Sequence, residues 1–192
     1  MKFKAVLILL SISSFVFSQT KNEKEERISE SDFPTKALEV VKHLPEKCKR
    51  LKFYKETDGD TYSFEVKFKY KGNRYSLEFY NDGRIEDIEV LTKFKNLKDD
   101  VRGDISNYFK ASFSKYRFIK VQEQFVKPSE LEDTTFVNDV LDNTSKVSPN
   151  FEIIAEVKSD TNHDIREFTF NHSGEIVDFR ILNPASYEHV LY

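Results

Sequence analysis

Two aspartates stand at equivalent positions of two similar segments of this sequence, and two carboxyl groups are what paired acid–base chemistry requires. Asp87 and Asp178 lie in two similar segments, 83–91 and 174–182. Two carboxyl groups at a defined separation act as acid and base in glycoside hydrolysis, but a sequence does not give that separation. The alternation of apolar and polar residues breaks at each aspartate, which predicts a β-bulge around 86–87 and 177–178. We therefore expect bulge geometry, not catalysis, to explain both residues.

The other residue types that carry chemistry form no recognised motif. Asp58-Gly59-Asp60 lacks the length and the closing glutamate of a calcium loop, and no Gly-x-Ser-x-Gly elbow is present. The single cysteine, Cys48, excludes an intrachain disulfide and a cysteine-based zinc site. The only histidines are His43, His163, His172 and His189, and no close cluster of histidine, aspartate and glutamate has metal-ligand spacing. The sequence predicts a non-enzymatic protein without a cofactor or a metal.

Charge and composition narrow the class of partner. The 192 residues carry a net charge of −3 with both signs interspersed, whereas nucleic-acid binders are normally basic. Eighteen phenylalanines, nine tyrosines and no tryptophan indicate a phenylalanine-rich β core. We expect no nucleic-acid partner and one domain or two small ones.

The N-terminus has the pattern of a secretory signal. Two lysines precede the apolar stretch 5–17, which is too short to span a bilayer comfortably. Val16 and Ser18 stand at the positions that a signal peptidase reads, so we predict removal of 1–18 by cleavage after Ser18. The mature chain would then be periplasmic or secreted, without a membrane span. Residues 19–30 are expected to form a polar, mobile lead-in.

A repeat organises the rest of the chain. Segments 83–91 and 174–182 share Gly, Ile, Asp and Leu at the same positions. The repeat predicts two copies of one unit, 31–92 and 97–182, followed by a tail, 183–192. The second copy carries an insertion at 127–149, where Ser129 and Glu132 have the spacing of a capping box that begins a short helix.

Each unit is predicted to contain one helix and four strands. Pro34 suits the start of the first helix, and apolar residues recur at helical spacing in both units. Alternation in 62–70 and 75–79 predicts two strands joined at Gly72-Asn73, which pairs Phe68 with Leu77 and Lys67 with Glu78. In the second unit Val157 would pair with Phe168. The expected fold is α+β: two tandem α-β-β-β-β units forming an antiparallel, roughly eight-stranded sheet with helices on one face.

This pattern resembles a known family. The motifs are Asp32-Phe33-Pro34 at a helix start, Tyr62-x-Phe-x-Val-x-Phe, Tyr75-x-Leu-x-Phe and Asn81-Asp82-Gly83. After a secretion signal, they resemble the PepSY-like, beta-lactamase-inhibitor-like family of periplasmic proteins. The resemblance implies an eight-stranded curved sheet covered by helices on one face, and binding of a protein or a ligand rather than catalysis.

Three large side chains are candidates for partner contacts. Strand parity places Tyr54, Tyr80 and Ile154 on the face without helices, among charged residues, and interface centres favour such anchors. We therefore expect a module that binds a protein partner through the open sheet face and that could inhibit an envelope enzyme. The alternative is an envelope sensor or carrier that holds a small ligand in a pocket under the 127–149 insertion.

Overall fold

The computed structural model describes residues 20, 21 and 23–182. The predicted signal peptide, its predicted cleavage site after Ser18, and the predicted 183–192 tail lie outside these residues. In the described part, no helix has both the length and the apolar character needed to cross a membrane.

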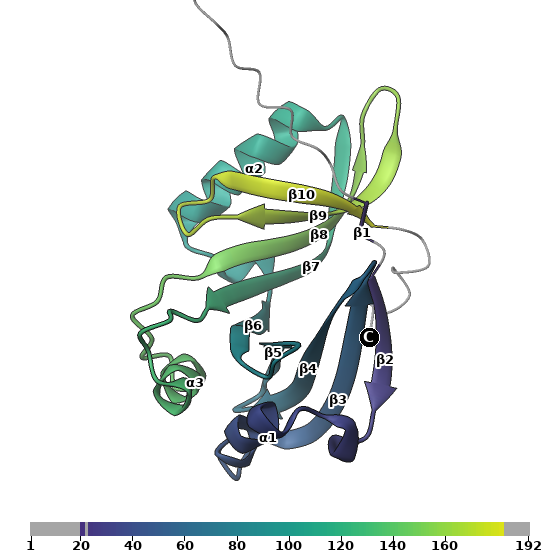
Figure 1. The fold of residues 1–192 in the computed structure, drawn as a ribbon. Coiled ribbons are helices and arrows are strands. Elements are labelled where there is room, and N and C mark those ends of the chain that lie inside the picture. The colour runs from purple at the N-terminus through teal and green to yellow at the C-terminus, as the bar shows by residue number, and fades with distance from the viewer. Residues whose placement is uncertain (1–19, 22, 183–192) are drawn as a thin grey trace, which may run out of the picture.

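One sheet forms the centre of the molecule (Figure 1). In the described residues its ten strands lie in the order β1-β10-β9-β8-β7-β6-β5-β4-β3-β2. All neighbours are antiparallel except the β1–β10 pair, which is parallel. The strands are β1 (Thr20–Lys21), β2 (Glu23–Ile28), β3 (Lys49–Asp58), β4 (Thr61–Tyr70), β5 (Asn73–Tyr80), β6 (Ile85–Thr92), β7 (Lys115–Val126), β8 (Asn150–Lys158), β9 (His163–Phe170) and β10 (Ile176–Leu182).

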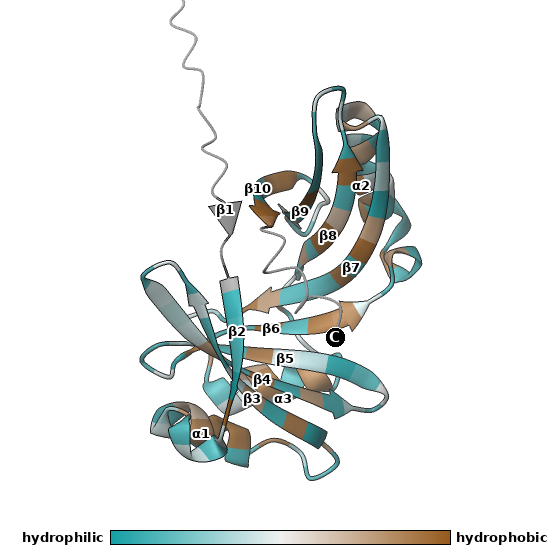
Figure 2. Cartoon of the chain, turned by 90° about the vertical axis from the view of Figure 1, so that its right-hand side faces the viewer, coloured by the Kyte–Doolittle hydropathy of each residue, from teal (hydrophilic) through white to brown (hydrophobic). Residues whose placement is uncertain are grey.

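Three helices cover one face of the sheet. Helices α1 (Thr35–Lys42) and α3 (Asp133–Leu141) pack on the half that contains β3–β6, and α2 (Asp99–Ser112) packs on the half that contains β7–β9. Short 3₁₀ turns, Glu30–Asp32 and Phe94–Asn96, precede α1 and α2. Apolar residues, brown in Figure 2, recur along the strands and in the helices, and those of the helices pack with those of the strands in two core clusters. The α+β class with an antiparallel sheet is thus confirmed.

The first hairpin has a different register from the one predicted. Tyr70 pairs with Asn73, so the turn residues are Lys71 and Gly72 rather than Gly72 and Asn73. Both have positive φ, 46° and 89°, as a two-residue hairpin turn of this kind requires. Phe68 consequently pairs with Tyr75 instead of Leu77. Lys67 likewise pairs with Ser76 instead of Glu78, and Glu78 pairs with Glu65. Because the shift is even, every side chain keeps its predicted face.

The second hairpin was also predicted in the wrong register. Phe168 pairs with Ile153, and Val157 pairs with Asp164. The ladder continues to Lys158 and His163, past the point where the apolar alternation ends. Backbone pairing thus extends into polar residues, which a pattern of apolar side chains does not reveal.

Both predicted bulges are present. Glu78 pairs with Asp87 while Phe79 pairs with Ile85, which leaves Glu86 as the extra residue. The matching irregularity in β10 falls between Ile176 and Asp178. The sequence signal for these bulges was the shared break in alternation.

The described part of the expected lead-in is not a free segment. Strand β2 pairs along its whole length with β3, and β1 pairs with β10 at the opposite edge of the sheet. A single residue, Asn22, separates these two strands in sequence. The two sheet edges must therefore lie close together, so the sheet is strongly curled.

The segment predicted as an insertion, 127–149, packs on the first half of the molecule rather than on the second predicted unit. Its helix α3 buries Phe136, Val137, Val140 and Leu141 in the cluster formed with α1 and β4–β6. The helix begins later than predicted: Glu132 is its N-cap and accepts a hydrogen bond from the Thr135 N–H at 2.7 Å. The insertion thus completes a core that the short helix α1 leaves partly uncovered.

Candidate functional site

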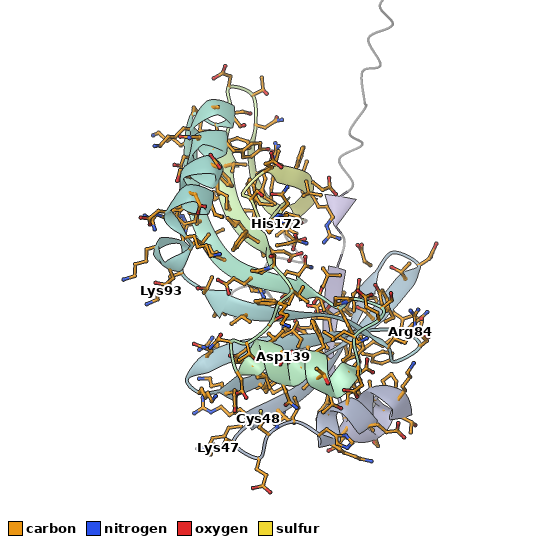
Figure 3. All side chains as sticks on the ribbon, turned by 90° about the vertical axis from the view of Figure 1, so that its left-hand side faces the viewer. Lys47, Cys48, Arg84, Lys93, Asp139 and His172 are labelled. Atoms are coloured by element: carbon orange, nitrogen blue, oxygen red, sulfur yellow. The ribbon has the colours of Figure 1, made fainter. Side chains whose placement is uncertain are left out.

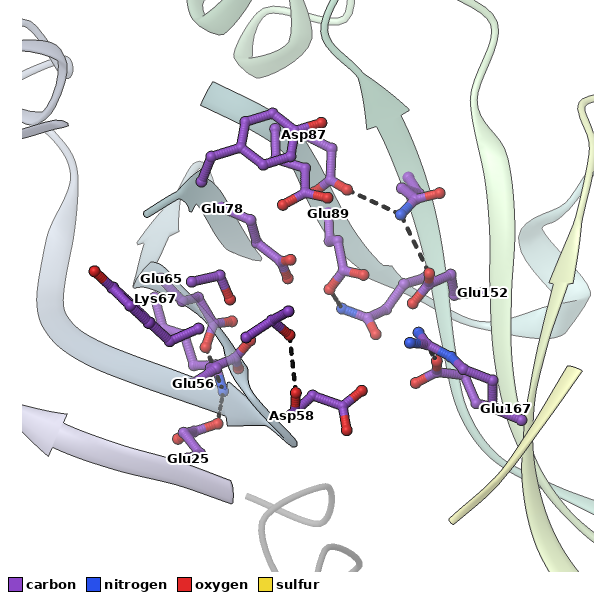
Figure 4. Close-up of a pocket in the computed structure, with 18 of the residues that line it drawn as sticks. Glu25, Glu56, Asp58, Glu65, Lys67, Glu78, Asp87, Glu89, Glu152 and Glu167 are labelled. Atoms are coloured by element: carbon purple, nitrogen blue, oxygen red, sulfur yellow. Dashed lines mark hydrogen bonds and ion pairs between the residues drawn. The ribbon is translucent and has the colours of Figure 1, made fainter. Parts of the chain in front are cut away.

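The face without helices forms an acidic cleft on the inside of the curled sheet. This cleft has a volume of about 470 Å³ and is lined by residues from β2 to β10. Ten carboxylates and three cationic side chains line it. The carboxylates belong to Glu25, Glu56, Asp58, Glu65, Glu78, Glu86, Asp87, Glu89, Glu152 and Glu167, and most are labelled in Figure 4.

Strand register explains why the acids gather. Glu65 on β4 pairs with Glu78 on β5, and Glu78 pairs with Asp87 on β6. This arrangement places three acidic residues in one row across three strands. Like charges directly opposite each other destabilise a sheet, so the row is costly unless protons or cations neutralise it.

Lys67 neutralises one end of the cleft. Its ammonium group lies 2.5 Å from Glu25 Oε2 and 3.0 Å from Glu65 Oε2. Burial disfavours its charge, but the carboxylates of Glu65 and Glu25 outweigh this effect and raise the pKa of Lys67. Glu65, which is 3% exposed, also accepts a hydrogen bond from Ser76.

Amide side chains and one arginine donate hydrogen bonds to other carboxylates of the cleft. Gln122 donates to Glu89, and Gln124 Nε2 bridges Asp87 Oδ2 at 2.9 Å and Glu152 Oε1 at 3.2 Å. At the β9–β10 side, Arg180 donates to Glu167 Oε1 at 2.6 Å. The cleft therefore already contains one guanidinium–carboxylate pair.

The acids in the centre of the cleft have less compensation. Burial, together with the charges of Glu89 and Asp87, raises the pKa of Glu78 well above its usual range. Burial, together with Glu89 and Glu86, has the same effect on the pKa of Asp87. These carboxyl groups therefore retain protons at a higher pH than ordinary acidic side chains do.

One group of acids has the spacing of a metal site. Carboxylate oxygens of Glu25, Glu56 and Glu65 lie within 4.8 Å of one another. The ammonium of Lys67 contacts two of the three carboxylates. This group is therefore arranged around a lysine, and we do not assign a metal to it.

A second cavity, of about 550 Å³, adjoins the cleft and has the opposite charge. Six residues line both cavities: Glu25, Glu65, Lys67, Glu89, Lys120 and Gln122. Lysines and arginines dominate the lining of the second cavity; they are Arg50, Lys52, Lys67, Lys69, Arg74 and Lys120. The concave face thus has an acidic region and a basic region side by side.

Comparison with known proteins supports the fold. No protein-family model matches the sequence, and no curated protein matches it. A solved structure, that of a DUF2874 family protein from Bacteroides ovatus ATCC 8483, has a similar fold. It shares 12% identity with this chain, covers 78% of this chain and 89% of its own, and has a TM-score of 0.52. At this identity the likeness concerns the fold alone.

The three predicted contact residues lie on the concave face but differ in exposure. Tyr80 is 39% exposed and lines the acidic cleft, whereas Tyr54 is half-buried and lines the basic cavity. Ile154 also lines the cleft, but at 4% exposure it is a buried residue rather than an accessible anchor. The reason is its position on β8 between Lys120 and Glu167, in the interior of the curled sheet.

The two bulge aspartates, Asp87 and Asp178, have different surroundings in the structure. Asp87 is 3% exposed inside the cleft, whereas Asp178 is exposed. The other candidates remain scattered: Cys48 and His172 lie in different halves of the molecule (Figure 3), and His163 pairs with Glu156 on the surface. His189 lies outside the described residues.

Sequence reasoning did not identify Glu78, Asp87 and Glu89 as a cluster. The available signal was the outward parity of these acids on neighbouring strands, but their convergence depends on the exact register and on the curl of the sheet.

Proposed function

We propose that this protein is a secreted or periplasmic, non-enzymatic binding module that captures a protein partner on its concave sheet face. The observation that carries the proposal is the excess of ten carboxylates over three cationic side chains in the cleft. Complementary charge speeds association and selects among partners. The partner would therefore present basic side chains to this cleft.

Two tyrosines and the adjoining basic cavity refine this proposal. Tyr80 at the acidic cleft and Tyr54 at the basic cavity offer aromatic surface next to each charged region. In the basic region, the cross-strand neighbours Lys49, Lys69 and Arg74 form a row of like charges. A partner surface with a basic and a neighbouring acidic patch would match both regions.

The alternative of a small-ligand pocket under the insertion has less support. The two cavities on the concave face contain no residue of 127–149 in their linings. Helix α3 instead uses its apolar side in the core. A small organic cation in the acidic cleft is a distinct outcome that the experiments below separate from protein capture.

We also propose that the two halves are tandem copies of one α-β-β-β-β unit. Gly83 and Gly174 support this, since both have a left-handed φ, 80° and 83°. A Cβ at Gly83 would lie 3.2 Å from the Ala37 amide nitrogen of α1, and one at Gly174 would lie 3.0 Å from the Val101 carbonyl oxygen of α2. Each unit would thus have a glycine at the equivalent turn position, where the absence of a side chain lets the turn pack against the helix of that unit.

The test is capture from an envelope extract by immobilised mature chain, residues 19–192. Tyr54→Ser with Tyr80→Ser should weaken capture because central anchors are worth about 2 kcal/mol or more each. Val177→Ser is the matched control, since Val177 is 62% exposed and lies outside both cavities. Ile154 is left unchanged because it is buried. Capture that the tyrosine variant retains in full, or that excess basic peptide does not compete away, would contradict the proposed surface.

A further inference from the structure

The acidic cleft contains two clusters of carboxylates, and they differ in whether a cationic side chain of the protein neutralises them. Around Glu25, Glu56 and Glu65, the chain supplies the cation itself through Lys67. Around Glu78, Asp87 and Glu89, the described residues supply no ion pair. Figure 4 shows the carboxylates of this second cluster directed into the cleft.

A buried oxygen of Asp87 without a hydrogen-bond donor is a second, independent indication that this cluster binds a ligand. The residue is 3% exposed, and its Oδ2 accepts a hydrogen bond from Gln124 at 2.9 Å. Its other oxygen, Oδ1, is buried and has no hydrogen-bond partner among the described residues. A buried acceptor without a donor is costly, and such a group in the wall of a cleft fits a donor supplied by a ligand.

The neighbours of Asp87 add further acceptors at the same place. Glu78 lies directly opposite Asp87 on β5 and makes no hydrogen bond or ion pair with the described residues. Glu89 is two residues away on β6, on the same side of the strand, and accepts a hydrogen bond from Gln122. Three carboxylates thus share one short stretch of the wall, and their local donors are neutral amides.

We propose that this second cluster is a guanidinium subsite that receives one arginine side chain of the protein partner. The inference rests on the proposed function and specifies its chemistry. A guanidinium is planar, weakly hydrated and carries five N–H donors, so it can serve several carboxylates that are not in contact with one another. Its charge would offset the row of acids, and its donors would reach Asp87 Oδ1.

The spacing of the acids favours a guanidinium over a metal ion. A metal requires ligand oxygens close enough to share one ion, and in the described part of the chain that spacing is found at Glu25, Glu56 and Glu65. The cluster at Glu78, Asp87 and Glu89 does not meet it. Arg180 and Glu167 already form a guanidinium–carboxylate contact of 2.6 Å in the same cleft.

The experiment is an NMR titration of the mature chain, residues 19–192, with N-acetyl-arginine amide. The side-chain amide of Gln124 is the local probe because it is hydrogen-bonded to Asp87. N-acetyl-lysine amide and calcium chloride are titrated in parallel. We expect the arginine compound to shift the Gln124 amide signals at concentrations at least about tenfold lower than the lysine compound does, because bidentate pairing distinguishes the two cations.

Two variants and a matched control locate the site. Asp87→Asn and Glu78→Gln should each weaken arginine binding at least about fivefold, as loss of a charged hydrogen-bond partner does. Asp178→Asn changes the equivalent, exposed bulge position of the other half and should have no effect. Circular dichroism verifies that each variant folds; if one aspartate or glutamate variant does not, the other carries the test.

The outcomes separate this inference from the proposed function. Equal binding of arginine and lysine, a response to calcium alone, or unchanged binding in a folded Asp87→Asn or Glu78→Gln variant would overturn the subsite. Partner capture that both variants retain would leave the proposed function intact and refute the arginine contact. Arginine binding that depends on Asp87, without capture of any protein, would support the subsite and contradict the proposed function.

Discussion

Glu78 and Asp87 face each other directly across β5 and β6, on the wall of the acidic cleft. Neither carboxylate has an ion-pair partner among the described residues. When both acids are ionised they repel each other, and this repulsion lowers the stability of the fold.

Glu78→Gln should stabilise the protein at neutral pH. Like charges in direct cross-strand pairs cost about 0.2–1 kcal/mol, and the substitution removes one of them while keeping the shape of the side chain. Urea denaturation at pH 7 measures the gain. Glu46→Gln, at an exposed position before β3, is the control and should leave the free energy of unfolding unchanged.

The same variant should alter how stability depends on pH. The pKa values of Glu78 and Asp87 are raised in the folded protein, so the folded state binds more protons than the unfolded state above the ordinary carboxylate pKa of about 4. The stability that these two groups contribute is therefore fully present below that ordinary pKa. It is lost as the pH rises through their raised pKa values in the folded protein. A wild-type curve with no such loss, or one that Glu78→Gln leaves unchanged, would refute this interpretation.

Lys67→Met should destabilise the protein and create a divalent-cation site. Loss of the ammonium leaves the buried Glu65 without its charged partner, at a cost of about 2 kcal/mol. The carboxylate oxygens of Glu25, Glu56 and Glu65, all within 4.8 Å of one another, are close enough to share a calcium ion once the ammonium is gone. Calcium chloride should raise the melting temperature of this variant and not that of the wild type. Lys47→Met, in the exposed turn before β3, is the control for loss of one lysine.

Phe136→Ala should be as costly as substitutions in the strands. Phe136 of the insertion is 0% exposed and packs in the cluster with Phe68 of β4. Phe136→Ala, Phe68→Ala and Phe170→Ala should each cost about 3–5 kcal/mol, measured by urea denaturation. Deleting 129–145 should unfold the first half, since α3 is part of its core. A deletion variant with wild-type stability would show that the insertion is dispensable.

Much of the fold followed from side-chain alternation, because burial on one face imposes it. Phe68 and Phe168 are both buried in the core even though the cross-strand partners predicted for them, Leu77 and Val157, were wrong. An error of an even number of residues moves partners but not faces. The turn at Lys71-Gly72 was missed because a lysine with positive φ carries no sequence signal, unlike the glycine beside it.

The site was less predictable than the fold, because it depends on long-range geometry. Glu65, Glu78 and Asp87 become neighbours through two strand pairings, and the first was predicted two residues out of register. The curl of the sheet then converts an open polar face into a cleft. It also buries Ile154, whose outward parity alone suggested an exposed anchor.

The last prediction concerns the pH dependence of binding to a basic partner. Burial and neighbouring acids raise the pKa of Glu78 and Asp87, so the free cleft retains protons that a cation must displace. Binding of N-acetyl-arginine amide should therefore release protons and weaken as the pH falls from about 8 to about 5. Calorimetry in two buffers of different ionisation enthalpy measures the proton release directly. The Asp87→Asn variant should reduce both the proton release and the pH dependence, because only Glu78 then retains a raised pKa, whereas Asp178→Asn should keep both at the wild-type level. An affinity that is constant over this range would mean that the cluster is already ionised in the free protein, and proton uptake on binding would equally contradict the prediction.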